Sequence, residues 1–242
     1  MKKIRIYDTL NEYLECEKWW IFTILMCVSG FYGAFTYSIR GGIFCNAQTA
    51  NFVLFAMALG HGQWKHALYF VIPMSAYFLG AVLSESLPNR IKKLGLIRWD
   101  TLLIFIEILV VIFLALLPET APYQISQVLI NFICSMQYNT FRQAQSVPMA
   151  TTFCTNHVRQ TGIALCKAIR HQELDYVGRM ICHTGMLLAF VVGGVISTYL
   201  CTKFQGKAMF AALLPLFIVL IDLLYADLKK EKGHLDKVPH GH

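Results

Sequence analysis

The chain has 242 residues, of which 56% are hydrophobic and only 14% are charged. An ordinary soluble domain has about 45–50% apolar and about 25% charged residues, so this composition argues against a water-soluble core. The formal net charge of +7 is dispersed between hydrophobic segments rather than gathered in one region. We therefore expect a membrane protein whose partner is the lipid bilayer, and we expect no nucleic-acid partner.

Long stretches without Asp, Glu, Lys or Arg follow one another along the chain. The five longest have between 19 and 24 residues, and a helix needs about 20 residues to cross about 30 Å of hydrocarbon. Eight hydrophobic segments result in chain order, at residues 19–39, 43–60, 67–87, 101–117, 122–141, 149–168, 178–201 and 208–226. Because irregular backbone does not face lipid, we expect these segments to be helical.

The second and sixth segments contain many more polar side chains than the other six. These side chains are Asn46, Gln48, Thr49 and Asn51 in the second segment and Thr151, Thr152, Thr155, Asn156, His157, Arg159 and Gln160 in the sixth. A helix that faces lipid would not tolerate such a series. We expect both segments to be broken or re-entrant and to be surrounded by protein or water.

An internal repeat links these two polar segments. Residues 49–51 align with 155–157 at an offset of 106, and residues 76–84 align with 189–197 at an offset of 113. The ordered recurrence indicates a duplicated half-protein, with chance similarity between apolar helices as the alternative. The expected divisions are a cytoplasmic segment 1–18, a first membrane repeat 19–117, a second membrane repeat 118–227 and a flexible C-terminal tail 228–242.

The positions of Lys and Arg predict how the segments cross the membrane. If all eight segments span, 12 basic residues lie inside and 8 outside, whereas the counts become 16 and 4 if segments two and six enter and leave on one side. Basic residues near helix ends accumulate on the cytoplasmic side. The sequence therefore predicts an all-α polytopic membrane bundle of two inverted repeats, with six spanning helices and two re-entrant or broken helices. Both termini are expected to lie on the cytoplasmic side of the inner membrane.

Several short motifs lie in and around the two polar segments. They are Arg40-Gly41-Gly42-Ile43-Phe44, Asn46-Ala47-Gln48-Thr49-Ala50-Asn51, Met136-Gln137 with Thr140-Phe141-Arg142, and Thr151-Thr152-Phe153-Cys154-Thr155-Asn156-His157-Val158-Arg159. In these motifs, and over about residues 19–226, the chain resembles the YoaK family of bacterial multi-pass membrane proteins. The resemblance implies the fold and the membrane location but no substrate.

Inverted repeats with broken segments at matching positions are typical of secondary transporters, and opposed re-entrant half-helices also form channel constrictions. We therefore expect a transporter or channel whose site lies between the two broken segments. The expected solute-binding residues are Asn46, Gln48, Thr49, Asn51, Thr151, Thr152, Thr155, Asn156, His157 and Arg159. The alternative is that these polar side chains only join helices to one another.

Charged residues near the broken segments narrow the class of solute. Arg40, Arg142 and Arg159 lie at or inside these segments and favour a small anionic or polar solute. Glu107 lies in an apolar helix and is a candidate for proton coupling, whereas Asp222 is expected at the membrane interface. Arg159 lies deepest, so we expect Glu107, backbone carbonyls, water or an anionic solute to compensate its charge.

The sequence predicts no catalytic residue, metal site or cofactor. The eight cysteines include no CxxC pair, and neither HExxH nor GxSxG occurs. A membrane-embedded hydrolase or transferase that uses His157, Cys154 or Ser146 is nevertheless an alternative. A receptor or assembly factor without transport is another, and a homo-oligomer is compatible with either.

Overall fold

The computed structural model describes residues 13–93 and 95–240, and these residues are almost entirely helical. The α-helices are α1 (Trp19–Ile39), α2 (Gln48–Gly60), α3 (Trp64–Ser86), α4 (Pro88–Lys92), α5 (Trp99–Leu116), α6 (Tyr123–Thr140), α7 (Thr155–His171), α8 (Leu174–Phe204) and α9 (Leu213–Tyr225). Short helical turns are η2 (Glu15–Glu17), η3 (Gln205–Ala212), the π-helical η4 (Ala226–Lys230) and η5 (Lys232–His234). A hairpin of β1 (Gln143–Ala144) and β2 (Val147–Pro148) is the one departure from helix among these elements.

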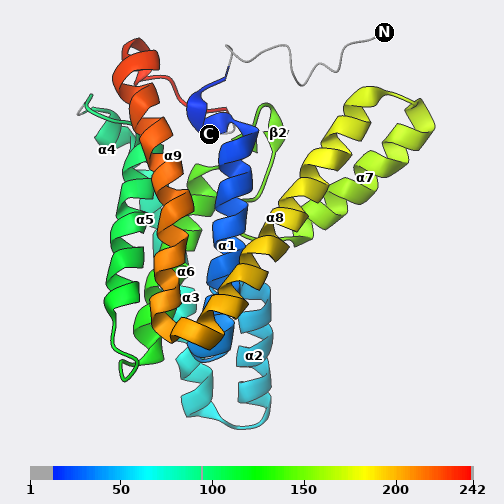
Figure 1. The fold of residues 1–242 in the computed structure, drawn as a ribbon. Helices are drawn as coiled ribbons and strands as arrows, with labels where there is room; N and C mark the ends of the chain where they lie inside the picture. The colour runs from blue at the N-terminus through cyan, green and yellow to red at the C-terminus, as the bar shows by residue number, and fades with distance from the viewer. Residues whose placement is uncertain (1–12, 94, 241–242) are drawn as a thin grey trace.

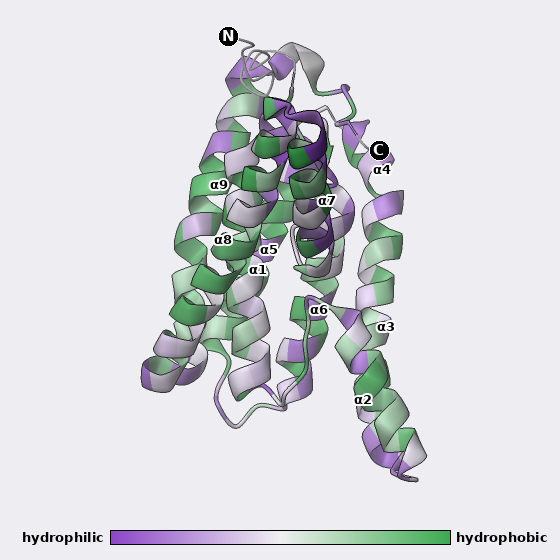
Figure 2. Ribbon diagram, turned by 90° about the vertical axis from the view of Figure 1, so that its right-hand side faces the viewer, coloured by the Kyte–Doolittle hydropathy of each residue, from purple (hydrophilic) through white to green (hydrophobic). Residues whose placement is uncertain are grey.

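Within the described ranges, four helical segments are long and apolar enough to cross a membrane. They are Trp19–Ile39, Trp64–Lys92, Trp99–Leu116 and Leu174–Lys230. Hydrophobic residues predominate along these helices, while hydrophilic residues concentrate at the ends of the bundle and along α7 (Figure 2). Many of the large hydrophobic side chains lie on outer faces. A soluble protein would not leave so many large apolar side chains exposed, so these faces are suited to lipid. The chain is therefore a helical membrane protein.

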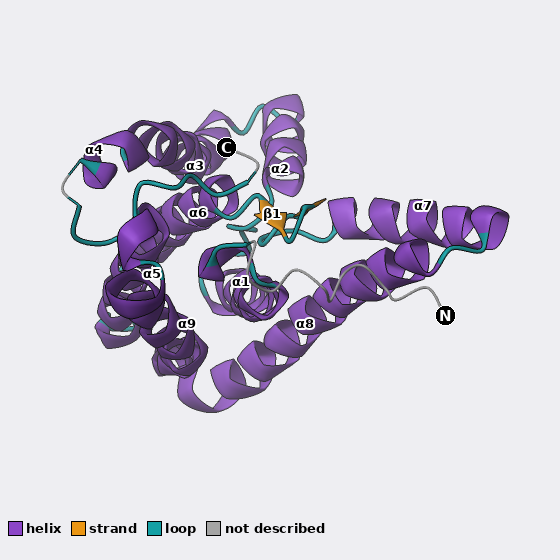
Figure 3. Ribbon diagram, turned by 90° about the horizontal axis from the view of Figure 1, so that it is seen from above, coloured by secondary structure: helices purple, strands orange, loops and turns teal. Residues whose placement is uncertain are grey.

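Two helix pairs form the centre of the bundle. α8 packs along α1 and α6 packs along α3, while α5 and α9 contact each other on one side (Figures 1 and 3). α2 packs against α3, and α7 packs against α8. Figure 3 shows α7 and the first half of α8 extending sideways from the bundle.

Glycines allow the two central pairs to approach closely. A Cβ atom at Gly193 of α8 would lie 1.8 Å from the carbonyl oxygen of Cys27 in α1. A Cβ atom at Gly80 of α3 would lie 2.5 Å from the carbonyl oxygen of Phe132 in α6. Small residues permit such backbone contacts between membrane helices. Gly80 and Gly193 also occupy matching positions in the internal repeat.

Both polar segments begin with non-helical backbone. The second segment becomes helical only at Gln48 and the sixth only at Thr155. Gly41 and Gly42, with φ of 84° and 73°, reverse the chain after α1, a conformation that glycine adopts readily. In Figure 1, α2 then begins partway along the bundle and runs towards the end at which α1 stops. Each of these two segments therefore starts with a non-helical turn, and a re-entrant course through the membrane stays a prediction.

One end of the bundle brings distant parts of the chain together. Residues 13–18, α4, the β1–β2 hairpin and residues 226–240 all lie there (Figure 1). The Gln145 amide donates to the Glu17 carbonyl at 3.0 Å, and the His240 amide donates to Glu17 Oε1 at 2.8 Å. The C-terminal tail, which we expect to be flexible, therefore lies against the N-terminal turn in this structure.

A buried ionic cluster centred on Arg98 stabilises this end. Arg98 Nε donates to Asp100 Oδ1 at 3.3 Å, and its backbone amide donates to Asp227 Oδ2 at 3.0 Å. Glu231 Oε2 lies 3.8 Å from Arg98 Nη1. Burial alone would lower the pKa of Arg98, but the charges of Asp100 and Glu231 outweigh it and raise that pKa. Arg98 is therefore a cation shared by three carboxylates.

An ion pair stabilises the opposite end of the bundle. Arg40 Nη1, at the end of α1, donates to Glu119 Oε2 at 2.8 Å, and the Gly206 amide donates to Glu119 Oε1 at 2.6 Å. Burial would raise the pKa of Glu119, but these hydrogen bonds outweigh it and lower the pKa. One carboxylate thus joins α1, the α5–α6 loop and the start of η3.

Candidate functional site

Neutral polar side chains meet at the centre of the bundle, between the two broken segments. Asn46 Nδ2, in the loop before α2, donates to the Ser29 carbonyl of α1 at 3.1 Å. Gln137 Nε2 of α6 donates to Ser29 Oγ at 3.3 Å and to the Thr151 carbonyl, in the loop before α7, at 3.4 Å. All four residues are buried. We call Ser29, Asn46, Gln137 and Thr151 the central polar seam.

The polar face of α6 continues from this seam towards α2. Gln48 Nε2 donates to Asn131 Oδ1 at 2.7 Å, and Asn131 Nδ2 donates to the Gln127 carbonyl at 2.8 Å. Gln127 Nε2 donates in turn to the Arg40 carbonyl at 2.6 Å. Buried amides therefore connect α6 with the beginning of α2 and with the end of α1.

Several atoms in and beside the seam have no hydrogen-bond partner among the described residues. They are Gln127 Oε1, Gln137 Oε1, Thr151 Oγ1 and Thr152 Oγ1. A buried polar atom without a partner costs about 1–3 kcal/mol, so most buried polar groups in native proteins are paired. These four oxygens therefore keep unused hydrogen-bond acceptor capacity inside the bundle.

Asn51 and His157, which align in the internal repeat, make equivalent contacts. Asn51 Nδ2 donates to the Phe44 carbonyl at 2.7 Å, and His157 Nε2 bonds the Ala150 carbonyl at 2.7 Å. Each side chain is fully buried and bonds the residue seven positions earlier. Since a carbonyl only accepts, Nε2 of His157 carries the proton. Both residues therefore hold the loop that precedes their helix.

The remaining contacts of these two residues do not join the broken segments. His157 Nδ1 lies 3.0 Å from His183 Nδ1 on α8, and Asn51 Nδ2 also donates to Gln48 Oε1 at 3.2 Å. Within the described chain, the connection between the two loops runs through Ser29 and Gln137 instead.

A cavity of about 330 Å³ adjoins the loop before α7 and brings two expected site residues together. Arg142 and Asn156 line it with Tyr138, Asn139, Pro148, Met149 and Ala150. Arg142 Nη2 donates to Asn139 Oδ1 at 2.8 Å and also pairs with Glu85. Met149 and Ala150 directly precede Thr151 of the seam in the chain. We call this cavity the loop pocket.

Three expected site residues lie on the exterior. Thr49, Thr155 and Arg159 are exposed, and Arg159 Nη2 donates to Asn156 Oδ1 at 3.2 Å. The buried Glu107 accepts instead from the Tyr32 hydroxyl at 2.8 Å. Of the groups expected to compensate Arg159, Glu107 is therefore excluded, because the two side chains have different partners. The expected depth of Arg159 is wrong, because its side chain is exposed.

Sequence reasoning did not select Ser29, Gln127, Asn131 or Gln137 as site residues. A signal existed for part of this group, because Gln124, Gln127, Asn131 and Ser135 recur at spacings of three and four in an uncharged segment. That spacing places polar side chains on one face of a helix. Ser29 had no comparable signal, since single serines are common in apolar helices.

A protein-family match covers most of the chain. A family model described as "Protein of unknown function (DUF1275)" matches residues 21–221. No curated protein and no solved structure matches the chain. The match extends from α1 into α9 and includes both broken segments, the central polar seam and the loop pocket. The chain therefore belongs to the DUF1275 family.

Proposed function

We propose that this DUF1275 member, which resembles YoaK-type proteins, is a transporter or channel for a small anionic or polar solute. The solute path would run from the loop pocket through the central polar seam. The observation that carries the proposal is the set of unpaired acceptor oxygens, including Gln137 Oε1 and Thr151 Oγ1, where two broken segments meet. Polar groups that only join helices would be expected to satisfy one another.

The charges around the path favour the polar alternative over the anionic one. The seam consists of hydroxyl, amide and backbone groups without formal charge. Arg40 pairs with Glu119 and Arg142 pairs with Glu85, so neither arginine offers an uncompensated charge to an anion. An uncharged solute with N–H or O–H donors would complement the unpaired oxygens.

The proposed architecture is two inverted repeats, with six spanning helices and two re-entrant ones. Three features support it. Asn51 and His157 hold equivalent loops, Gly80 and Gly193 lie at equivalent helix contacts, and the α1–α8 pair corresponds to the α6–α3 pair under exchange of the halves. In secondary transporters such repeats place the solute site at their interface.

Flux measurements test the path directly. In sealed liposomes, we expect Gln137→Met to reduce the flux of small polar solutes at least about tenfold, because it removes the side chain that joins the two loops. Gln124→Met is the matched control, since Gln124 lies on the same helix beside the apolar side chains of α5. A well-folded Gln137→Met variant with parental flux and selectivity would exclude the seam from the path.

We also propose an inner-membrane location with the Arg98 end of the bundle in the cytoplasm. In intact cells, on a background without native cysteines, Lys65→Cys should react with an impermeant maleimide. Lys93→Cys should react only after the cells are permeabilised, because the loop around it carries the cytoplasmic basic cluster. Labelling of Lys93→Cys in intact cells would show that the proposed orientation is the wrong way round.

A further inference from the structure

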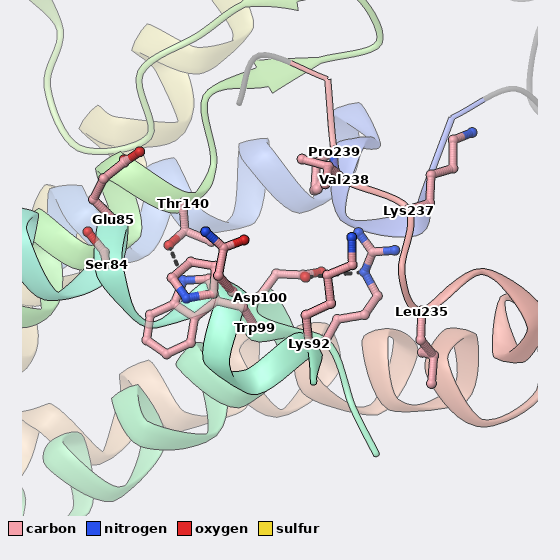
Figure 4. Close-up of a pocket in the computed structure, with 13 residues that line it drawn as sticks. Ser84, Glu85, Lys92, Trp99, Asp100, Thr140, Leu235, Lys237, Val238 and Pro239 are labelled. Atoms are coloured by element: carbon pink, nitrogen blue, oxygen red, sulfur yellow. Dashed lines mark hydrogen bonds and ion pairs between the residues drawn. The ribbon is translucent and has the colours of Figure 1, made fainter. Parts of the chain in front are cut away.

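A second cavity, of about 240 Å³, lies at the Arg98 end of the bundle. Its walls come from the ends of α3 and α6, from α4, from the start of α5 and from residues 235–239 of the C-terminal tail. Figure 4 shows Lys237, Val238 and Pro239 on the tail, across the cavity from Ser84 and Glu85. The cavity shares no lining residue with the loop pocket. We call it the tail cavity.

Two buried side chains of opposite charge line the tail cavity and keep unsatisfied atoms. Arg98 is 5% exposed and Asp100 is 4% exposed. Their mutual contact uses Arg98 Nε and Asp100 Oδ1, while Arg98 Nη1 and Asp100 Oδ2 have no hydrogen-bond partner among the described residues. The 3.8 Å from Nη1 to Glu231 Oε2 is too long for a hydrogen bond. A buried donor and a buried acceptor beside the cavity therefore both lack a hydrogen-bond partner.

The rim of the cavity adds a cation and an aromatic wall. Lys92 is exposed, and no carboxylate in the described parts of the chain forms an ion pair with it. Trp99 Nε1 donates to Thr140 Oγ1 at 2.8 Å, which fixes the indole as an apolar wall. Glu85, on the other side, already pairs with Arg142.

These groups together require a ligand of both signs. A purely anionic ligand would satisfy Lys92 and Arg98 Nη1 but would leave Asp100 Oδ2 buried and unpaired. A purely cationic ligand would leave Arg98 Nη1 without a hydrogen bond and would lie near the two lysines that line the cavity, Lys92 and Lys237. Unpaired buried groups and like charges both cost free energy, so a zwitterion fits best.

We propose that the tail cavity binds a zwitterionic group that carries a primary ammonium near a phosphate. The ammonium donates to Asp100 Oδ2, and phosphate oxygens accept from Lys92 Nζ and Arg98 Nη1 in charge-assisted hydrogen bonds. Two sources share this chemistry, the headgroup of an aminophospholipid and a soluble phosphoamine. The end of an apolar bundle is the level at which headgroups lie. The site is separate from the proposed solute path.

The thermal unfolding temperature of the full chain in detergent micelles tests the proposal. The probes are short-chain phosphatidylethanolamine, phosphatidylglycerol of the same chain length, and free phosphoethanolamine. We expect saturable stabilisation by the first probe and none by the anionic second probe. Equal stabilisation by free phosphoethanolamine would identify a soluble ligand, and stabilisation by the lipid alone would identify a headgroup. No shift with either ethanolamine probe, or an equal shift with phosphatidylglycerol, overturns the proposal.

Two neighbouring lysines provide a matched pair of variants. Lys92→Gln should raise the half-saturating concentration about tenfold, the loss expected for one charged hydrogen bond. Lys93→Gln makes the same charge change at an exposed residue that does not line the cavity, and it should bind like the parent. Asp100→Asn should weaken the binding of the ethanolamine probes as well. If Asp100→Asn does not fold, the two lysine variants still test the proposal. An equal change of the half-saturating concentration in Lys92→Gln and Lys93→Gln would contradict the proposed site.

Discussion

Gly193→Ala should prevent α1 and α8 from packing, and little folded protein should be recovered. The new Cβ atom would lie 1.8 Å from the Cys27 carbonyl oxygen and 3.0 Å from the Phe31 amide nitrogen. Both are backbone atoms, so no side chain can rotate away and the two helices must separate. Overpacking of this kind costs about 3 kcal/mol, at the upper end of the usual range. The yield of monodisperse protein in detergent and its thermal unfolding temperature measure the effect.

Gly194→Ala is the matched control for this prediction. It makes the same change one residue further along α8, where the nearest atom to a new Cβ would be the Gly30 carbonyl oxygen at 3.7 Å. That is an ordinary van der Waals distance, so the variant should fold like the parent. If Gly193→Ala were equally stable, the close approach of α1 and α8 would be wrong.

Arg98→Gln should cause a comparable loss of stability at the end of the bundle where the C-terminal tail lies. It leaves Asp100, Asp227 and Glu231 close together in a buried site without their shared cation. Removing one partner of a buried ion pair typically costs about 3–5 kcal/mol. Arg90→Gln is the control, because Arg90 is exposed on α4 in the same basic loop. Unfolding by denaturant, followed for both variants at pH 7, should show a loss only for Arg98→Gln.

The loss should shrink as the pH is lowered. Burial raises the pKa of Glu231 even beside Arg98, and removal of the guanidinium should raise it further. A carboxyl group whose pKa is higher in the folded state favours folding below its unfolded pKa of about 4.3, and this contribution is lost as pH rises through the folded pKa. Arg98→Gln should therefore be closer to the parent near pH 5 than at pH 7. If the stability loss of Arg98→Gln grew as the pH was lowered, uncompensated carboxylates could not be its cause.

Sequence patterns predicted the positions of the helices better than they predicted which side of each helix is buried. Uncharged stretches located α1, α3 and α6, because the length of a hydrophobic stretch directly reflects the thickness that it must cross. The sixth segment, predicted to be broken from its polarity, is non-helical up to Cys154 and lies beside the short β1–β2 pairing. Its polarity also suggested that Arg159 was deep, yet this residue is exposed on α7. Which side of a helix meets a neighbour depends on tertiary packing, which composition alone does not describe.

The candidate site was likewise only partly predictable. Asn46 and Thr151 were selected because polar residues interrupt apolar segments, and the structure brings both to the seam. Their junction depends on Ser29 and Gln137, whose spacing from either loop carries no periodic signal. The cluster around Arg98 was not expected at all, because Asp227 lies 129 residues away along the chain.

The unequal chemistry of Asn51 and His157 gives the two halves different mechanical properties. Asn51 both donates to the Phe44 carbonyl and accepts from the Phe44 amide, so the turn before α2 is closed by one side chain. His157 has one nitrogen for the Ala150 carbonyl and one for His183 on α8. A displacement of α8 is therefore transmitted to the turn before α7, whereas the turn before α2 can keep its shape while α3 moves.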